Sequence, residues 1–167
     1  MARGRISLYL QEYPLLIRQI TRLVELVRDH DPNVTLLALF GSTARLAPHR
    51  SSDADLLVLV HDIRQFYPLT TGAQSASVLG LLREAEDAPD GRICRWHFSI
   101  VPGNALGADV DEEFLKNVAG HGVLLYRQEG ASIPPVLEHL QPFDIWLERV
   151  QALLEHYTRR QAASLAS

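Results

Sequence analysis

Two short, almost wholly apolar segments, residues 34–40 and 55–60, lie close together in the sequence with only a brief polar stretch between them. Apolar runs of this length between turn residues are typical of buried β-strands. The first run ends at Gly41, and the second has the carboxylates of Asp53 and Asp55 at its entrance. The sequence therefore predicts two core strands whose connection holds a glycine turn and a pair of aspartates.

The residues of this connection suit phosphate and metal binding. Gly41 lets a ligand approach the backbone closely because it has no side chain. Ser42 can donate its hydroxyl to a phosphate oxygen, and the free N–H groups at the start of the short helix predicted there form an anion site. Asp53 and Asp55 are two apart on a strand, so they point the same way, about 7 Å apart. Such a pair is costly without a cation, and Mg²⁺ commonly joins carboxylates to substrate phosphates.

Arg45 lies one helical turn beyond Ser42. Two interpretations of this arginine stay open at the level of the sequence. Its guanidinium can reach the phosphates of a nucleotide held at the Gly-Ser turn, or it can be an ordinary solvated surface residue.

A third strand is predicted at residues 92–101, where apolar and polar residues alternate. Successive side chains of a strand lie on opposite faces of the sheet. One face carries Cys94, Trp96, Phe98 and Ile100, and the other carries Arg95, His97 and Ser99. We therefore expect the polar face of this strand to border a cleft.

The order Gly41-Ser42, ten further residues and Asp53-Ala54-Asp55 resembles the motif of the polymerase β-like nucleotidyltransferase superfamily, in particular its minimal nucleotidyltransferase-type domains. Residues 114–126 are similar to the closing helix and strand of that family, so the resemblance spans about residues 34–126. It implies transfer of a nucleoside monophosphate from a nucleoside triphosphate, with ATP expected, to a hydroxyl of a small molecule or protein. It further implies Mg²⁺ as cofactor, Asp53 and Asp55 as catalytic metal ligands, and Gly41 and Ser42 as the phosphate grip.

The sequence departs from the family at the third strand, where the family places a third carboxylate and this chain has none. Ser99 is the favoured positional equivalent. His97 can replace the acid as a general base near neutral pH, or it is simply a polar residue of a half-exposed strand. The base can also come from Asp144, from Glu148 or from the acceptor. Otherwise the protein is a nucleotide-binding regulatory or antitoxin-like protein with weak or no catalysis.

The expected fold class is α/β (α+β): a small mixed β-sheet with helices packed on one face, the nucleotidyltransferase fold, and an extra C-terminal helix. Residues 1–167 are expected to form a single domain with its core at about 34–126 and a helical extension at about 136–163. Apolar periodicity and turn signals give the remaining elements. Helices are predicted at residues 7–30, 75–87, 109–119 and 142–163, and a short strand at 123–126.

Composition narrows the classes of partner. The formal net charge of −4 argues against a polynucleotide, because nucleic-acid binders usually carry a basic face. Cys94 is the single cysteine, so an internal disulfide is excluded, and the seven histidines lack zinc-ligand spacing. No run approaches the ~20 apolar residues of a membrane span, so we expect a cytoplasmic protein. The expected partners are a nucleoside triphosphate, an unknown acceptor, and a second copy or a helical protein.

Overall fold

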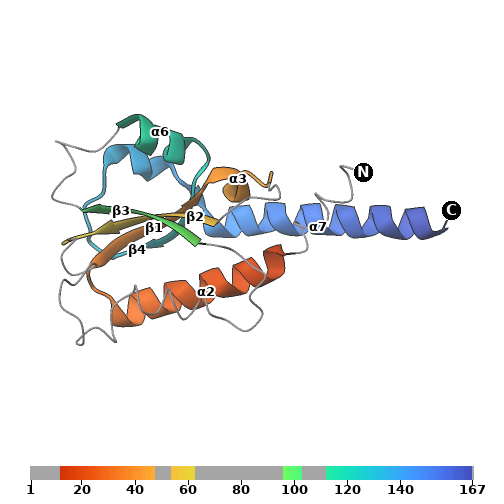
Figure 1. The fold of residues 1–167 in the computed structure, drawn as a ribbon, viewed down its shortest axis with the longest axis horizontal. Coiled ribbons are helices and arrows are strands. Elements are labelled where there is room, and N and C mark those ends of the chain that lie inside the picture. Colours follow the sequence, from red (N-terminus) through yellow and green to blue (C-terminus); the bar gives the residue numbers. More distant parts are fainter. Residues whose placement is uncertain (1–11, 48–53, 63–95, 103–111, 167) are drawn as a thin grey trace.

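A five-stranded mixed sheet lies at the centre of the molecule (Figure 1). The computed structural model describes residues 12–47, 54–62, 96–102 and 112–166. The strands are β1 (Val34–Phe40), β2 (Ala54–Val60), β3 (Trp96–Pro102), β4 (Val123–Arg127) and the short β5 (Gln141–Pro142). The helices are α2 (Tyr13–His30), α3 (Gly41–Ala44), α6 (Glu112–His121), the 3₁₀-helix η2 (Pro135–His139) and α7 (Phe143–Ala166).

The strands follow the order β3-β2-β1-β4-β5. β1 pairs antiparallel with both β2 and β4, whereas β2–β3 and β4–β5 are parallel. Every residue of β1 is buried, as expected of a central strand that is covered on both faces. The predicted strand at residues 34–40 is confirmed, and β2 begins one residue before its predicted start.

Helices cover both faces of the sheet, which corrects the expectation that they pack on one face. A break in register near the start of β1 lets Val34, Leu37 and Leu39 share one face, where they pack with residues of α2 and α7. Leu36 and Ala38 lie on the other face, with residues of α6 and η2. Figure 1 shows α2 and α6 on opposite sides of the sheet. The fold class itself, a small mixed sheet with helices, is confirmed.

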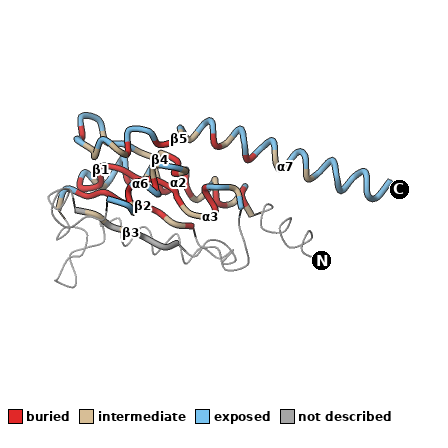
Figure 2. Tube along the Cα trace, turned by 90° about the horizontal axis from the view of Figure 1, so that it is seen from above, coloured by how far each residue is buried: buried red, intermediate tan, exposed pale blue. Residues whose placement is uncertain are grey.

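The two long helices present one apolar stripe each. Residues at helical spacing on α2 are buried, among them Leu16, Ile20 and Val27. Pro14 lies in the first turn of α2, where a missing N–H is tolerated. On α7 the buried residues Trp146 and Val150 both lie near its start, and partly buried Leu154 also packs against the core. The distal part of the helix extends beyond the body of the molecule (Figure 2).

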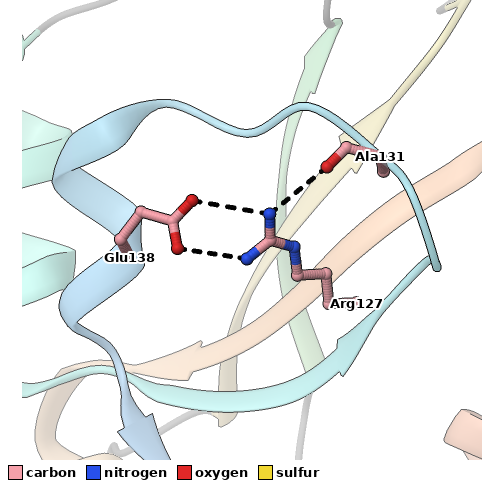
Figure 3. A network of polar contacts seen from close by, with 3 residues as sticks. All are labelled: Arg127, Ala131 and Glu138. Atoms are coloured by element: carbon pink, nitrogen blue, oxygen red, sulfur yellow. Dashed lines mark hydrogen bonds and ion pairs between the residues drawn. The ribbon is translucent and has the colours of Figure 1, made fainter.

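A network of polar contacts closes the connection between β4 and η2. Arg127, at the end of β4, donates two hydrogen bonds to the carboxylate of Glu138 on η2, at 3.1 and 3.4 Å (Figure 3). The same guanidinium donates to the carbonyl of Ala131 at 3.4 Å. The contacts are part-exposed, so we attribute to them the local conformation of this loop and little of the overall stability.

Several predicted features lie outside the described residues: the helix at 75–87, Cys94, Arg95, Asp53 and the loop before it. Among the helices that are described, none combines the length and apolar character needed to cross a membrane.

Candidate functional site

The Gly-Ser turn and Asp55 lie in contact where β1 ends and β2 begins. Phe40 pairs with Asp55 across the two antiparallel strands. Gly41 follows with φ of +78°, a left-handed conformation that favours glycine. A Cβ placed on Gly41 would come closer than 3.0 Å to Asp55 Oδ2. The half-buried carboxylate of Asp55 therefore lies directly against the backbone of the turn.

Two buried side chains, one from α2 and one from α7, donate hydrogen bonds to backbone carbonyls of α3. Tyr13 donates its hydroxyl to the carbonyl of Thr43 at 2.8 Å. Trp146 donates its indole N–H to the carbonyl of Ala44 at 3.0 Å. The two rings pack together with centroids 5.9 Å apart, and both side chains are buried. Buried Tyr and Trp normally require a partner for their polar atoms, and here those partners are the carbonyls of the turn.

A third side chain binds the start of the turn. The N–H of Gly41 donates to Nε2 of His121, at the end of α6, over 2.8 Å. A ring nitrogen that accepts a hydrogen bond carries no proton, so the imidazole of His121 is neutral in this structure. We call Tyr13, His121 and Trp146 the three turn supports.

The surroundings of His121 favour its neutral form. Burial lowers the pKa of His121 below its ordinary value of 6.5, the positive charge of Arg45 lowers it further, and a hydrogen bond with the Asn117 backbone acts in the opposite direction. Arg45 also donates to the side chain of Asn117 at 3.4 Å. Asn117 and His121 are four residues apart on α6 and so lie on the same side of that helix, the side that meets α3.

The register of β3 places the two candidate replacements for the missing acid. His97 pairs with Asp55 of β2, and Ser99 pairs with Leu57, two residues further along the same two strands. Paired residues of parallel strands lie on the same face of the sheet. Both positions are therefore on the face that carries Asp55, and His97 is the nearer of the two.

The remaining candidates are only partly placed. Asp53 lies outside the described residues, and within those residues no group of three or more His, Cys, Asp or Glu is arranged to hold a metal ion. Asp55 carries a carboxylate, and carboxylate oxygens are the kind of ligand that Mg²⁺ prefers. Asp144 and Glu148 are exposed on the first turns of α7, where Asp144 accepts the N–H of Ile145.

The turn supports were not identified from the sequence. His121 was missed because α6 was expected to end at residue 119, whereas it continues to His121 and so carries that ring back to α3. The signal for it was the spacing of Asn117 and His121, which share a helix face only if the helix continues. Trp146 lies within the helix predicted at residues 142–163, but the helix prediction alone does not indicate its hydrogen bond to α3.

Comparison with solved structures found chains from toxin–antitoxin complexes. This protein is similar to a chain of a toxin–antitoxin with AMP-PNP, with 19% identity over 88% of this chain and 95% of the other and a TM-score of 0.42. It is similar to a chain of a tri-AMPylated Shewanella oneidensis HEPN toxin in complex with MNT antitoxin, with 16% identity over 89% and 93% of the two chains and a TM-score of 0.39. It is also similar to a chain of the toxin–antitoxin MntA-HepT, with 17% identity over 89% and 94% of the two chains and a TM-score of 0.36. Comparison with curated proteins found no match.

A family model described as a nucleotidyltransferase domain matches residues 20–92. This stretch contains β1, α3 and β2 in full, together with the Gly-Ser turn and both aspartates. The match contains the Gly-Ser and Asp-x-Asp pattern that carries the predicted resemblance, and it overlaps the predicted span of residues 34–126 over residues 34–92. The resemblance to nucleotidyltransferases that the sequence predicted is therefore confirmed over residues 20–92.

Proposed function

We propose that this protein transfers a nucleoside monophosphate from Mg²⁺-bound ATP, or another nucleoside triphosphate, to a hydroxyl of a small molecule or protein. The observation that carries the proposal is the contact between Gly41 and Asp55. It brings a carboxylate that can bind a divalent cation against a turn whose backbone a phosphate can approach. Asp53 is assigned as the second metal ligand on the sequence pattern alone.

The contacts of the Gly-Ser turn indicate which of its residues can donate hydrogen bonds to a phosphate. The N–H of Gly41 already donates to His121, so Gly41 contributes close approach and not a donor. The phosphate contacts are therefore assigned to Ser42 and to the exposed guanidinium of Arg45, which follows α3 directly. An arginine beside a phosphate gives charge-assisted hydrogen bonds, which are stronger than neutral ones.

The reaction requires a nucleophile, a leaving group and a destination for one proton. The acceptor oxygen attacks the α-phosphorus, the bond from that phosphorus to the bridging oxygen breaks, and pyrophosphate leaves. Bound Mg²⁺ neutralises negative charge on the phosphates. We assign the acceptor proton to His97, whose place beside Asp55 in the sheet is nearer to the metal ligand than that of Ser99.

The direct test compares Asp55→Asn with Glu129→Gln, which removes an exposed carboxylate from the loop after β4. Affinity for ATP is measured by calorimetry with and without Mg²⁺. We expect the parent and Glu129→Gln to bind ATP in a Mg²⁺-dependent way, and Asp55→Asn to bind at least about ten-fold more weakly, as for losses around metal ligands. Equal, Mg²⁺-independent affinities in all three proteins would reject the site.

A second candidate function is nucleotide binding without transfer, as in a regulatory or antitoxin-like protein. One observation favours it: the position beside Asp55 on β3 is a histidine, not an acid. Release of pyrophosphate in the presence of hydroxyl acceptors separates the two functions. Turnover that falls in His97→Ala but not in Ser99→Ala supports transfer with His97 as base, and Mg²⁺-dependent binding without turnover supports the binding protein.

A further inference from the structure

A pocket of about 330 Å³ lies beside the Gly-Ser turn and is lined by basic side chains from four parts of the chain. Arg45 follows α3, His121 ends α6, His139 ends η2 and Arg149 lies on α7. The other lining residues are uncharged, and no carboxylate among the described residues lines the pocket. Four groups that carry or can take up positive charge thus converge on one concave surface.

The two arginines have no ion-pair partner within the part of the chain that the structure describes. Arg45 donates to the amide oxygen of Asn117, and Arg149 donates to the amide oxygen of Gln141 at 3.3 Å. By contrast, the guanidinium of Arg127 is paired with Glu138. A neutral acceptor holds an arginine in position without cancelling its charge, so both arginines keep their attraction for an anion.

One feature of the pocket opposes an anion, and its size can be estimated. The carboxyl end of α6 borders the pocket, and the end of a helix carries about −0.5 of an elementary charge. Arg45 and Arg149 together carry two full positive charges, which outweigh that partial charge. The pocket is therefore net attractive to anions even with both histidines neutral.

The volume of the pocket selects the size of the ligand. Sites for drug-sized ligands range from about 300 to 1,000 Å³ and are mostly apolar, whereas this pocket is at the small end of that range and has a polar lining. We infer that it binds a small phosphate-type oxyanion, such as phosphate or pyrophosphate, through Arg45 and Arg149. The inference stands without nucleotidyl transfer, because Asp55 does not line the pocket.

The test measures the affinity for inorganic pyrophosphate by calorimetry, without divalent metal and at fixed ionic strength. The variants are Arg149→Gln and the matched control Arg159→Gln, which removes an exposed arginine from the same helix away from the pocket. We expect at least roughly a ten-fold loss of affinity in Arg149→Gln, as for hydrogen bonds to charged groups, and parent affinity in Arg159→Gln. Circular dichroism checks that both variants are folded.

Two further arms identify the source of the oxyanion. Asp55→Asn is expected to keep its affinity for pyrophosphate, which separates this pocket from the proposed metal site. If Arg149→Gln also weakens Mg²⁺-ATP binding, the oxyanion is part of the nucleotide. If the variant weakens only pyrophosphate binding, the oxyanion is a separate ligand. Both results support the pocket as an oxyanion site. No measurable pyrophosphate binding by the parent, or equal losses in Arg149→Gln and Arg159→Gln, would overturn the inference.

Discussion

The Gly-Ser turn and the distal part of α7 differ in how much of the chain holds them in place. The turn is bound by three side chains that lie 30, 80 and 102 residues away in the sequence. No residue of α7 from Gln151 to Ala166 is buried, and Leu165 is 89% exposed. The same helix therefore has two parts: its first turns fix the candidate site, and its distal part adds little to the packed body. Substitutions in the two regions should differ accordingly.

The largest expected effect is at Trp146. Trp146→Ala removes a fully buried aromatic side chain and the donor to the Ala44 carbonyl. We expect the free energy of unfolding, measured in urea, to fall by about 3–5 kcal/mol. Trp146→Phe keeps most of the packing and loses the donor, with an expected cost of about 1–3 kcal/mol. A similar loss from Leu165→Ala, at the exposed end of α7, would contradict the division of the helix.

The next effect separates backbone strain from contact with Asp55. Gly41 and Gly130 both have positive φ, +78° and +75°, but a Cβ at Gly130 meets nothing within 4 Å. We expect Gly130→Ala to cost about 1–2 kcal/mol of stability from strain alone. Gly41→Ala should cost more, because it also displaces the Asp55 carboxylate, and it should abolish Mg²⁺-dependent ATP binding. Calorimetry of both variants tests this, and parent affinity in Gly41→Ala would show that the contact is unimportant.

The sequence predicted the centre of the fold well for physical reasons that are local. Residues 34–40 are apolar except for Thr35 and lie between Pro32-Asn33 and Gly41, so the ends of β1 were defined by the residues themselves. The nearly continuous apolar character of β1 also indicates that helices cover both faces of the sheet. The periodicity of a helix, by contrast, does not say which face of the sheet that helix covers.

The end of α6 shows why the site was harder to predict than the strands. The predicted helix ended at residue 119, directly before Gly120, yet Gly120 is helical and exposed, and a Cβ there would meet nothing within 4 Å. Such a glycine costs only about 0.5–1 kcal/mol. The glycine that the structure requires is Gly122, where a Cβ would come closer than 3.0 Å to the Val118 carbonyl and to the Leu140 side chain. The contact with Leu140, which directly follows η2, and the hydrogen bond of His121 to Gly41 both join residues that are distant in sequence.

A smaller effect is expected at Tyr13. Tyr13→Phe removes the hydrogen bond to the Thr43 carbonyl, which keeps the N–H of Leu46 as a second donor at 3.2 Å. The carbonyl is not left without a partner, so we expect a loss of only about 0.5–1.5 kcal/mol in urea unfolding. The control is Tyr157→Phe on the distal part of α7, where the hydroxyl accepts a hydrogen bond from exposed Gln161. It should change stability by less than about 0.5 kcal/mol, and a larger loss than in Tyr13→Phe would break the comparison.

The smallest effect on stability is expected from the protonation of His121. Burial first, and then the charge of Arg45, place the pKa of the folded ring below the ordinary value of 6.5. Between these two values the unfolded chain binds more protons than the folded one, so stability is lost as the pH falls below about 6.5. The imidazolium cannot accept the N–H of Gly41. We therefore expect the Gly41 amide and the His121 ring to titrate with one midpoint below 6.5 in NMR spectra.

The variant His121→Gln tests whether the hydrogen bond, and not only the charge, connects these two groups. A glutamine retains an acceptor oxygen but does not titrate, so the Gly41 amide should become insensitive to pH over this range. The decrease in stability below pH 6.5 should become shallower by the contribution of this one ring. If the Gly41 amide of His121→Gln still titrates as in the parent, its pH response comes from another group, and His121 is then a packing residue and not a support of the turn.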